Sequence, residues 1–292
     1  SGLVVGQRFN NLMEHLTLNV AGVEDFDDLN IPFRAVTTDV ARGEEVVLDR
    51  GHLPTAMRAS VSVPGLFSPV KWNDRLLVDG GLVNMVPVDV VRSMNVNVVS
   101  AVDVKAAAIE ALQNLDRYTI PDLVRASYNI LQTTGQADAH EQADLVIEPQ
   151  IADLTAVDYH RVAEFVPLGE EAAQSMAEQL SVWSVSPESY REYVAFQRRE
   201  RLGDLEISAI TVEGNDQVDE RVIRSVLSLQ PGDTLDTERL DRDLGAVYGL
   251  GEFESVGYRV ELDENGEAAR LRILAREKPW GPTYLHFGLR VE

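Results

Sequence analysis

The chain has 292 residues, of which 45% are hydrophobic and 25% are charged, so it can form a substantial core and is too long for one small domain. Its formal net charge of −22 argues against nucleic acid as a partner, because a polyanion needs a basic patch. Cysteine is absent, which excludes disulfides, thiolate metal sites and cysteine nucleophiles. No run approaches the roughly 20 apolar residues of a membrane helix. The chain opens on Ser1 rather than methionine, so we expect a fragment or a processed product.

The first hundred residues alternate between strand-like and helix-like patterns. Residues Pro32 to Val40 are apolar and β-branched, and a second such run, Glu44 to Gly51, follows an Ala-Arg-Gly turn, which predicts a hairpin. Leu53 to Ser60 has a proline in its first turn and predicts a short helix. Arg75 to Asp79 is the next predicted strand.

The alternation continues over the following hundred residues. Residues Pro87 to Met94 have helical spacing, and Val96 to Val104 is a continuous apolar run, as in a strand that is buried on both faces of a parallel sheet. Further on come a helical pattern from Pro121 to about Gln142, a short apolar strand that ends at Pro149, and an amphipathic helix from Glu170 to Trp183. We therefore expect residues 1–185 to form a layered α/β domain with a central, largely parallel sheet.

The composition changes after this domain. Ser186 to Asp204 is a charged stretch that predicts a solvated linker helix. Residues 205–278 then follow a strand, helix, helix, strand, strand order, and the Asn265–Gly266 pair between the last two strands is a strong hairpin signal. Residues 279–292 alternate apolar with polar or small residues, which suits either the first strand of a larger β-barrel or a lone edge strand.

One ionisable side chain stands out, because the apolar strand Arg75 to Asp79 ends in a carboxylate followed by Gly80 and Gly81. Open α/β folds place their ligands at the carboxyl ends of strands, and glycines there allow a tight turn and the close approach of another backbone or a substrate. On residue types alone, the simpler interpretation is that Asp79 merely caps a turn.

Four motifs around Asp79 give this stretch a wider context. They are Thr38-Asp39 after a strand, the Ala-Ser-x-Ser-x-Pro-Gly-Leu-Phe-x-Pro run from Ala59 to Pro69, Asp-Gly-Gly at Asp79 to Gly81, and Asn-x-x-Pro at Asn84 to Pro87. In spacing and order they resemble the patatin-like phospholipase family. With the later Ala-Asp-Leu-Val-Ile-Glu-Pro strand and the helix that starts near Gly169, the resemblance extends over most of residues 2–183.

The resemblance implies a secreted lipid acyl hydrolase of the phospholipase A type that uses a serine–aspartate dyad and no metal or other cofactor. Asp79 matches the dyad's aspartate and would be the general base, with Gly80 and Gly81 supporting the motif. The Gly-x-Ser-x-Gly elbow that carries the family's serine is absent from this sequence, so we expect the nucleophile upstream of Ser1. Ser60 and Ser62 belong to the structural Ser-x-Ser-x-Pro run instead.

The other chemically active side chains are weaker candidates. Asp39 is expected to cap a turn and is a second choice as a catalytic residue. The acidic segment Glu24 to Asn30 lacks the glycine and terminal glutamate of a calcium loop, so it predicts a solvated turn. The five histidines have no metal-ligand spacing and are expected in surface or packing roles: His15, His52, His140, His160 and His286.

Residues 205–278 resemble a POTRA domain, the module that precedes outer-membrane β-barrels. The likeness rests on Val-Glu-Gly-Asn at Val212 to Asn215, Leu-x-Pro-Gly-Asp at Leu229 to Asp233, and Leu-Gly-x-Phe-x-x-Val at Leu250 to Val256. Such a fusion implies a bacterial outer-membrane autotransporter with a periplasmic POTRA domain and an exported hydrolase. Its partners would be lipid esters, the membrane surface, and its own barrel and passenger segment. The alternative is a catalytically inert polypeptide-binding module that carries an incomplete lipase.

Overall fold

The structure is a computed structural model that describes residues 6–104, 136–151, 161–197, 205–263 and 268–278. Their contacts group them into two compact units. One unit contains the described residues of 1–29, 50–58 and 199–292, and the other contains those of 30–49 and 59–198. None of the helices within the described ranges is long and apolar enough to cross a bilayer.

A four-stranded antiparallel sheet dominates the unit that contains Asp79, with the strand order β2-β1-β4-β3. The predicted hairpin is confirmed, since β1 and β2 pair antiparallel with Asp39 opposite Glu44. All five residues of β1 are buried, which explains its continuous apolar and threonine-rich sequence. The strands are β1 (Ala35–Asp39), β2 (Glu44–Leu48), β3 (Val70–Trp72) and β4 (Arg75–Asp79).

The strand that carries Asp79 does not belong to a parallel sheet, which differs from the sequence-based expectation. Parallel pairing in this unit occurs between β5 and β6 instead. β4 pairs antiparallel with both β1 and β3. The physical reason on the β3 side is the two-residue connection between Trp72 and Arg75, because only antiparallel strands can be joined by so short a turn. Asn73 has a φ of 52°, in the left-handed region that asparagine tolerates in such turns.

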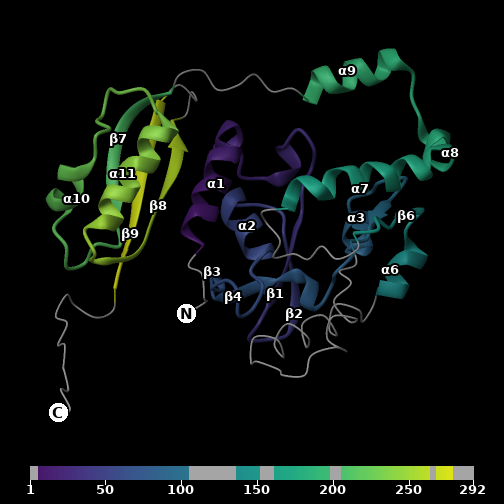
Figure 1. The fold of residues 1–292 in the computed structure, drawn as a ribbon, viewed down its shortest axis with the longest axis horizontal. Helices are drawn as coiled ribbons and strands as arrows, with labels where there is room; N and C mark the ends of the chain where they lie inside the picture. The colour runs from purple at the N-terminus through teal and green to yellow at the C-terminus, as the bar shows by residue number, and fades with distance from the viewer. Residues whose placement is uncertain (1–5, 105–135, 152–160, 198–204, 264–267, 279–292) are drawn as a thin grey trace, which may run out of the picture. The chain divides into compact units, whose positions relative to one another are not determined.

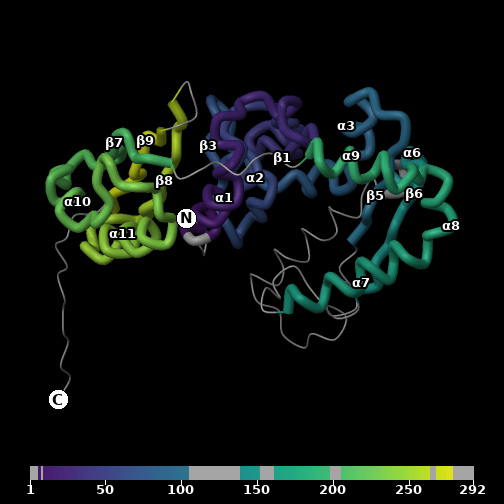
Figure 2. The backbone as a smooth tube through the Cα atoms, turned by 90° about the horizontal axis from the view of Figure 1, so that it is seen from above, coloured from purple at the N-terminus to yellow at the C-terminus, as the bar shows by residue number. Residues whose placement is uncertain are grey.

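The second sheet of this unit is the parallel pair β5 (Ser100–Val102) and β6 (Leu145–Ile147). Helices α3 (Val88–Ser93) and α6 (Gln136–Gln142) lie beside it in both views (Figures 1 and 2). The predicted strand, helix, strand order is therefore confirmed over the described residues, and so is the α/β fold class. Residues 121–135 of the expected long helix lie outside the described ranges. A small buried cluster joins the helices to the pair: Val86, Val88, Val99 and Ala101.

Helices without a single buried residue follow in the same unit. They include the amphipathic segment that the sequence predicts from Glu170 to Trp183 and part of the predicted linker helix, both of which are helical as expected. The elements are α7 (Val162–Ser175), α8 (Ala177–Leu180), the short 3-10 turn η5 (Ser181–Trp183) and α9 (Pro187–Gln197).

The other unit contains the βααββ segment that the sequence predicts. Its sheet has the order β7-β9-β8, with β7 parallel and β8 antiparallel to the central β9, and α10 and α11 cover one face of it (Figure 1). The elements are β7 (Glu206–Glu213), α10 (Glu220–Val226), α11 (Thr237–Gly249), β8 (Phe253–Leu262) and β9 (Ala268–Glu277). The same unit includes α1 (Gln7–Thr17), the 3-10 turns η1 (Leu18–Val20) and η2 (Phe26–Asp28), and the start of α2 (Leu53–Ser60).

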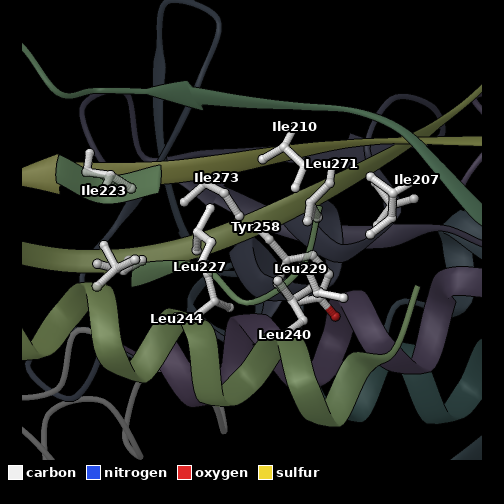
Figure 3. Close-up of a cluster of buried hydrophobic side chains, with 14 of the residues drawn as sticks. Ile207, Ile210, Ile223, Leu227, Leu229, Leu240, Leu244, Tyr258, Leu271 and Ile273 are labelled. Atoms are coloured by element: carbon white, nitrogen blue, oxygen red, sulfur yellow. The ribbon is translucent and has the colours of Figure 1, made fainter. Parts of the chain in front are cut away.

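The core of the βααββ segment lies between α11 and the sheet (Figure 3). Leu240, Leu244 and Val247 are spaced by three or four residues, so they share the helix face that meets the strands, and all three are buried. Asp243 lies on the same helix and is also buried, and its carboxylate accepts the backbone N–H groups of Ser228 and Leu229 at 2.8 and 2.9 Å. This carboxylate therefore ties the loop between the two helices to α11.

Candidate active site

Asp79 is the last residue of β4, where it follows two of the most deeply buried side chains among the residues that the structure describes. Leu77 and Val78 are 0% and 1% exposed, whereas Asp79 is only half-buried. The apolar residues of β4 therefore pack in the core, and the carboxylate of Asp79 lies at the edge of that core. The register places Asp79 opposite Thr37 of β1.

Three hydrogen bonds fix Asp79 in place. Its Oδ1 accepts the backbone N–H of Gly81 at 2.8 Å, which caps the 3-10 turn η3 (Gly80–Leu82). Its own N–H donates to the carbonyl oxygen of Ser62 at 3.1 Å, and the hydroxyl of Thr38 donates to its carbonyl oxygen at 2.8 Å. The turn-capping role is therefore real, and it holds one carboxylate oxygen in a defined orientation.

Gly80 has a more specific function than allowing a turn. A Cβ atom at this position would lie 2.3 Å from the carbonyl oxygen of Val36 and 2.6 Å from its carbonyl carbon. Any side chain would therefore collide with the backbone of β1. The glycine lets η3 pack directly on β1, which is the close approach of another backbone that the Asp-Gly-Gly sequence suggests.

Asn84 ties the residues after Asp79 to their surroundings. Its side-chain amide donates to Oε2 of Glu45 at 2.6 Å and to Oδ1 of Asp89 at 2.9 Å, so it connects the turn with β2 and α3. Pro87 of the Asn-x-x-Pro motif is the N-cap residue of α3. These contacts explain why the motif extends past the glycines.

The two serines of the Ser-x-Ser-x-Pro run, Ser60 and Ser62, form hydrogen bonds with the backbone near Asp79. The Ser60 hydroxyl donates to the carbonyl oxygen of Val36 at 2.8 Å, the same oxygen that faces Gly80. Ser62 is fully buried, and its carbonyl oxygen receives the N–H of Asp79. Both residues therefore support the backbone around Asp79, and neither stands on a strand-to-helix elbow.

Asp39 caps the turn between β1 and β2, as the sequence predicts. Its Oδ1 accepts the N–H of Ala41 at 3.0 Å, and its Oδ2 forms an ion pair of 2.5 Å with Arg42. The hydrogen bond from the Arg42 guanidinium, the largest cause, holds the pKa of the Asp39 carboxyl below its ordinary value of 3.8. A carboxylate that is stabilised in its charged form is a poor proton acceptor, so Asp39 is poorly suited to act as a base.

The structure also brings together three residues that the sequence does not connect. Asp103, His140 and Glu148 have their ligand atoms within 4.8 Å of one another. Histidine spacing gives no sign of this cluster, because its members are far apart in the chain. The available signal is that Asp103 and Glu148 each directly follow a short strand of the parallel pair. Of the other described histidines, His52 contacts Thr55 at 2.7 Å and Glu14 at 3.3 Å.

The expected solvated acidic turn near residue 25 is a capped 3-10 turn. Asp25 accepts the N–H of Asp27 at 3.1 Å and lies 3.5 Å from Arg50, while Phe26 is fully buried beneath it. The Asp25 carboxylate therefore has a structural role at the start of η2, while Glu24, Asp27 and Asp28 are exposed to solvent as expected.

The geometry defines an α/β part with a positioned carboxylate at a strand end, joined in sequence to a βααββ domain. Residues 7–92 match the family of patatin-like phospholipases, and residues 205–278 match the POTRA family, described as surface antigen variable number repeat. The chain therefore combines a patatin-like phospholipase segment in its N-terminal part with a POTRA domain in its C-terminal part.

Known relatives match part of this chain. An uncharacterised NTE family protein of Mycobacterium tuberculosis is 34% identical over 89 residues, which cover 30% of this chain and 25% of that protein. A second one from the same species is 26% identical over 195 residues, covering 59% and 31%. Patatin-like phospholipase domain-containing protein 7 of Mus musculus is 39% identical over 88 residues, covering 30% and 6%. The chain thus spans a third or less of the length of these relatives.

Solved structures match part of this chain. The N-terminal domain of Omp85 from Thermosynechococcus elongatus has 25% sequence identity and a TM-score of 0.24, covering 26% of this chain and 31% of that one. BamA from Haemophilus ducreyi lacking POTRA domains 1–3 has 19% identity and a TM-score of 0.26, covering 27% and 15%.

Proposed function

We propose that this chain is part of a serine lipid acyl hydrolase of the phospholipase A type, in which Asp79 is the general base of a serine–aspartate dyad. The observation that carries the proposal is the position of Asp79, half-buried at the end of β4 and oriented by Gly81, within the residues that match patatin-like phospholipases. The matched family supplies the substrate class, which is the ester bond of a lipid.

The proposed chemistry rests on the carboxylate of Asp79. Oδ1 accepts the Gly81 N–H, which fixes the side-chain orientation, and the carboxylate so oriented is the group assigned to proton transfer. A serine hydroxyl is a poor nucleophile at neutral pH, so a base must take its proton as it attacks the ester carbonyl. Asp79 then returns the proton to the leaving alcohol. Backbone amides of a glycine-rich loop would stabilise the oxyanion.

The proposal places the nucleophile upstream of Ser1, because the 292 residues contain no Gly-x-Ser-x-Gly sequence. It keeps the domain boundaries expected from the sequence: a hydrolase part at 1–185, a linker at 186–204, the POTRA domain at 205–278 and the start of a barrel strand at 279–292. In this arrangement the POTRA domain is periplasmic, the barrel lies in the bacterial outer membrane, and the hydrolase is the exported passenger, at the cell surface or released. Residues 279–292 lie outside the described ranges.

The test uses the full-length protein, including the segment upstream of Ser1. Asp79→Asn keeps the shape of the side chain and its bond to Gly81 but removes the base, so kcat for hydrolysis of a short-chain p-nitrophenyl ester and of a phospholipid should fall by roughly 10²–10⁴. Asp74→Asn is the matched control, because it makes the same charge change in the exposed turn before β4 and should leave kcat unchanged. Circular dichroism checks that both variants fold. A near wild-type rate for Asp79→Asn would rule out the dyad.

A second function stands beside the first, namely a catalytically inert, polypeptide-binding transport module. The order β7-β9-β8 favours it, because it places the ten-residue strand β8 at the end of its sheet, where an extended segment can pair by backbone hydrogen bonds. Such a segment would displace the side chain of Gln7 in α1, which accepts the N–H of Val256 at 3.3 Å. The sequence upstream of Ser1 discriminates between the two functions. A Gly-x-Ser-x-Gly elbow there, with Asp79-dependent hydrolysis, supports the hydrolase, and its absence supports the transport module.

A further inference from the structure

Two acidic residues follow the parallel strands β5 and β6 at the same edge of the pair. Val102 pairs with Ile147 in the register, so the next residues, Asp103 and Glu148, leave the strands at the same level. The N–H of Asp103 donates to the carbonyl oxygen of Ile147 at 2.9 Å, which extends the pairing up to this point. The backbone therefore brings the two carboxylates together at the carboxyl edge, where α/β sheets bind their ligands.

Helix α6 adds an imidazole to these carboxylates. His140 Nε2 lies 2.7 Å from Oδ2 of Asp103, and the ligand atoms of His140, Asp103 and Glu148 all lie within 4.8 Å of one another. Asp103 is only 2% exposed, while Glu148 is exposed to solvent. The cluster is thus anchored at its inner end by a buried carboxylate and is open to solvent at its outer end.

We propose that Asp103, His140 and Glu148 form a binding site for a divalent transition-metal ion, with Zn²⁺ as the best fit. One imidazole and two carboxylates are a ligand set that zinc accepts, whereas Ca²⁺ and Mg²⁺ prefer sites made only of oxygen atoms. Three protein ligands leave the fourth position of a tetrahedral zinc ion to water. Asp103 directly follows β5, His140 lies on α6 and Glu148 directly follows β6, so a bound ion links all three elements.

The metal-free site and the metal-bound site differ in the distance between His140 and Asp103. Without the ion, the two side chains are in direct hydrogen-bond contact. With zinc–ligand bonds of about 2.0–2.1 Å, a tetrahedral site separates its ligand atoms by about 3.3 Å. Entry of the ion therefore requires the 2.7 Å contact between Nε2 and Oδ2 to open by about 0.6 Å. A small rotation of either side chain achieves this. The oxygen of Glu148, which lies within 4.8 Å of both atoms, becomes the third ligand when its exposed side chain brings it to about 3.3 Å from them.

The direct test is calorimetric titration of the purified, metal-stripped chain, residues 1–292, with Zn²⁺. The expected result is one ion per chain with at least tenfold weaker binding in His140→Ala and in Glu148→Gln. Glu148 is exposed, so its variant folds even if the removal of buried Asp103 does not. Glu141→Gln removes an exposed charge beside His140, and His52→Ala removes a histidine that contacts a different carboxylate, so both controls should bind as the wild type does.

A second measurement reports the kind of ligand at the metal. Co²⁺ in place of Zn²⁺ should give visible absorption bands of four-coordinate intensity, and these should disappear in His140→Ala. Mg²⁺ and Ca²⁺, added at the same concentration as Co²⁺, should not displace the bound Co²⁺. The proposal is overturned if the wild type takes up no ion, if the His140 and Glu148 variants bind as tightly as the wild type, or if Mg²⁺ or Ca²⁺ competes on equal terms. None of these readouts depends on ester hydrolysis.

Discussion

Replacing Gly80 by alanine should destabilise the four-stranded sheet, and the structure gives the size of the effect. The new Cβ atom would lie 2.3 Å from the Val36 carbonyl oxygen, while real contacts of this kind stay above 3.0 Å, so β1 and η3 must separate by at least 0.7 Å. Overpacking of this sort costs about 1–3 kcal/mol. The same shift weakens the hydrogen bonds from Ser60 to Val36 and from Thr38 to Asp79, at about 1 kcal/mol each at most. We expect a loss of about 2–4 kcal/mol in the free energy of unfolding.

The assay is urea unfolding followed by the fluorescence of Trp72, which lies on β3 beside β4 and therefore reports on this sheet. The other two tryptophans, Trp183 and Trp280, are replaced by phenylalanine in all samples. Gly169→Ala is the matched control, because that glycine lies in α7 with nothing within 4 Å of its Cβ position. It should be neutral or should stabilise by up to about 1 kcal/mol, since alanine favours a helix. A loss below about 1 kcal/mol for Gly80→Ala would refute the proposed close packing of η3 on β1.

Two further predictions concern buried carboxylates. Because the native pKa of Asp39 is below its ordinary value of 3.8, its charge stabilises the fold above about pH 4, and this contribution is lost as the pH falls through the lowered pKa. The stability difference between wild type and Asp39→Asn in urea unfolding should therefore shrink from pH 5 to about pH 2, and a difference independent of pH would contradict this. Asp243→Ala leaves the N–H groups of Ser228 and Leu229 without their acceptor, so it should destabilise the POTRA domain by about 2–4 kcal/mol in calorimetric unfolding. A loss under about 1 kcal/mol would show that water replaces the carboxylate.

Local patterns in the sequence were sufficient to predict the elements built from neighbouring residues. The hairpin of β1 and β2 follows from two β-branched runs around a short turn, and the helix Leu53–Ser60 follows from its proline at the first turn. The βααββ order of residues 205–278 was also predictable, because each strand and helix there has its own clear period. In these cases the interactions that decide the structure lie within about ten residues.

Pairings between distant residues could not be predicted in the same way. Strand β3 is only three residues long, so alternation cannot reveal it, although the Asn73–Asp74 turn was an available signal. The direction of β4 relative to β1 depends on a contact between residues some forty positions apart, and local sequence does not determine it. The sequence suggested that Gly80 admits a backbone, but only the sheet shows that this backbone is Val36. The cluster around His140 is a similar case of assembly by the fold.

The strand order of the POTRA domain determines when its sheet can be completed as the chain emerges, N-terminus first, from a ribosome or a translocation pore. β9 is the last strand of the domain in the chain, yet it is the central strand, and it pairs with both β7 and β8. Until Ala268–Glu277 is available, the two outer strands have no common neighbour, and the buried residues Leu271 and Ile273 are missing from the core. The domain therefore remains incomplete until its own C-terminal strand has emerged, by which time the whole segment that matches patatin-like phospholipases, residues 7–92, has already emerged.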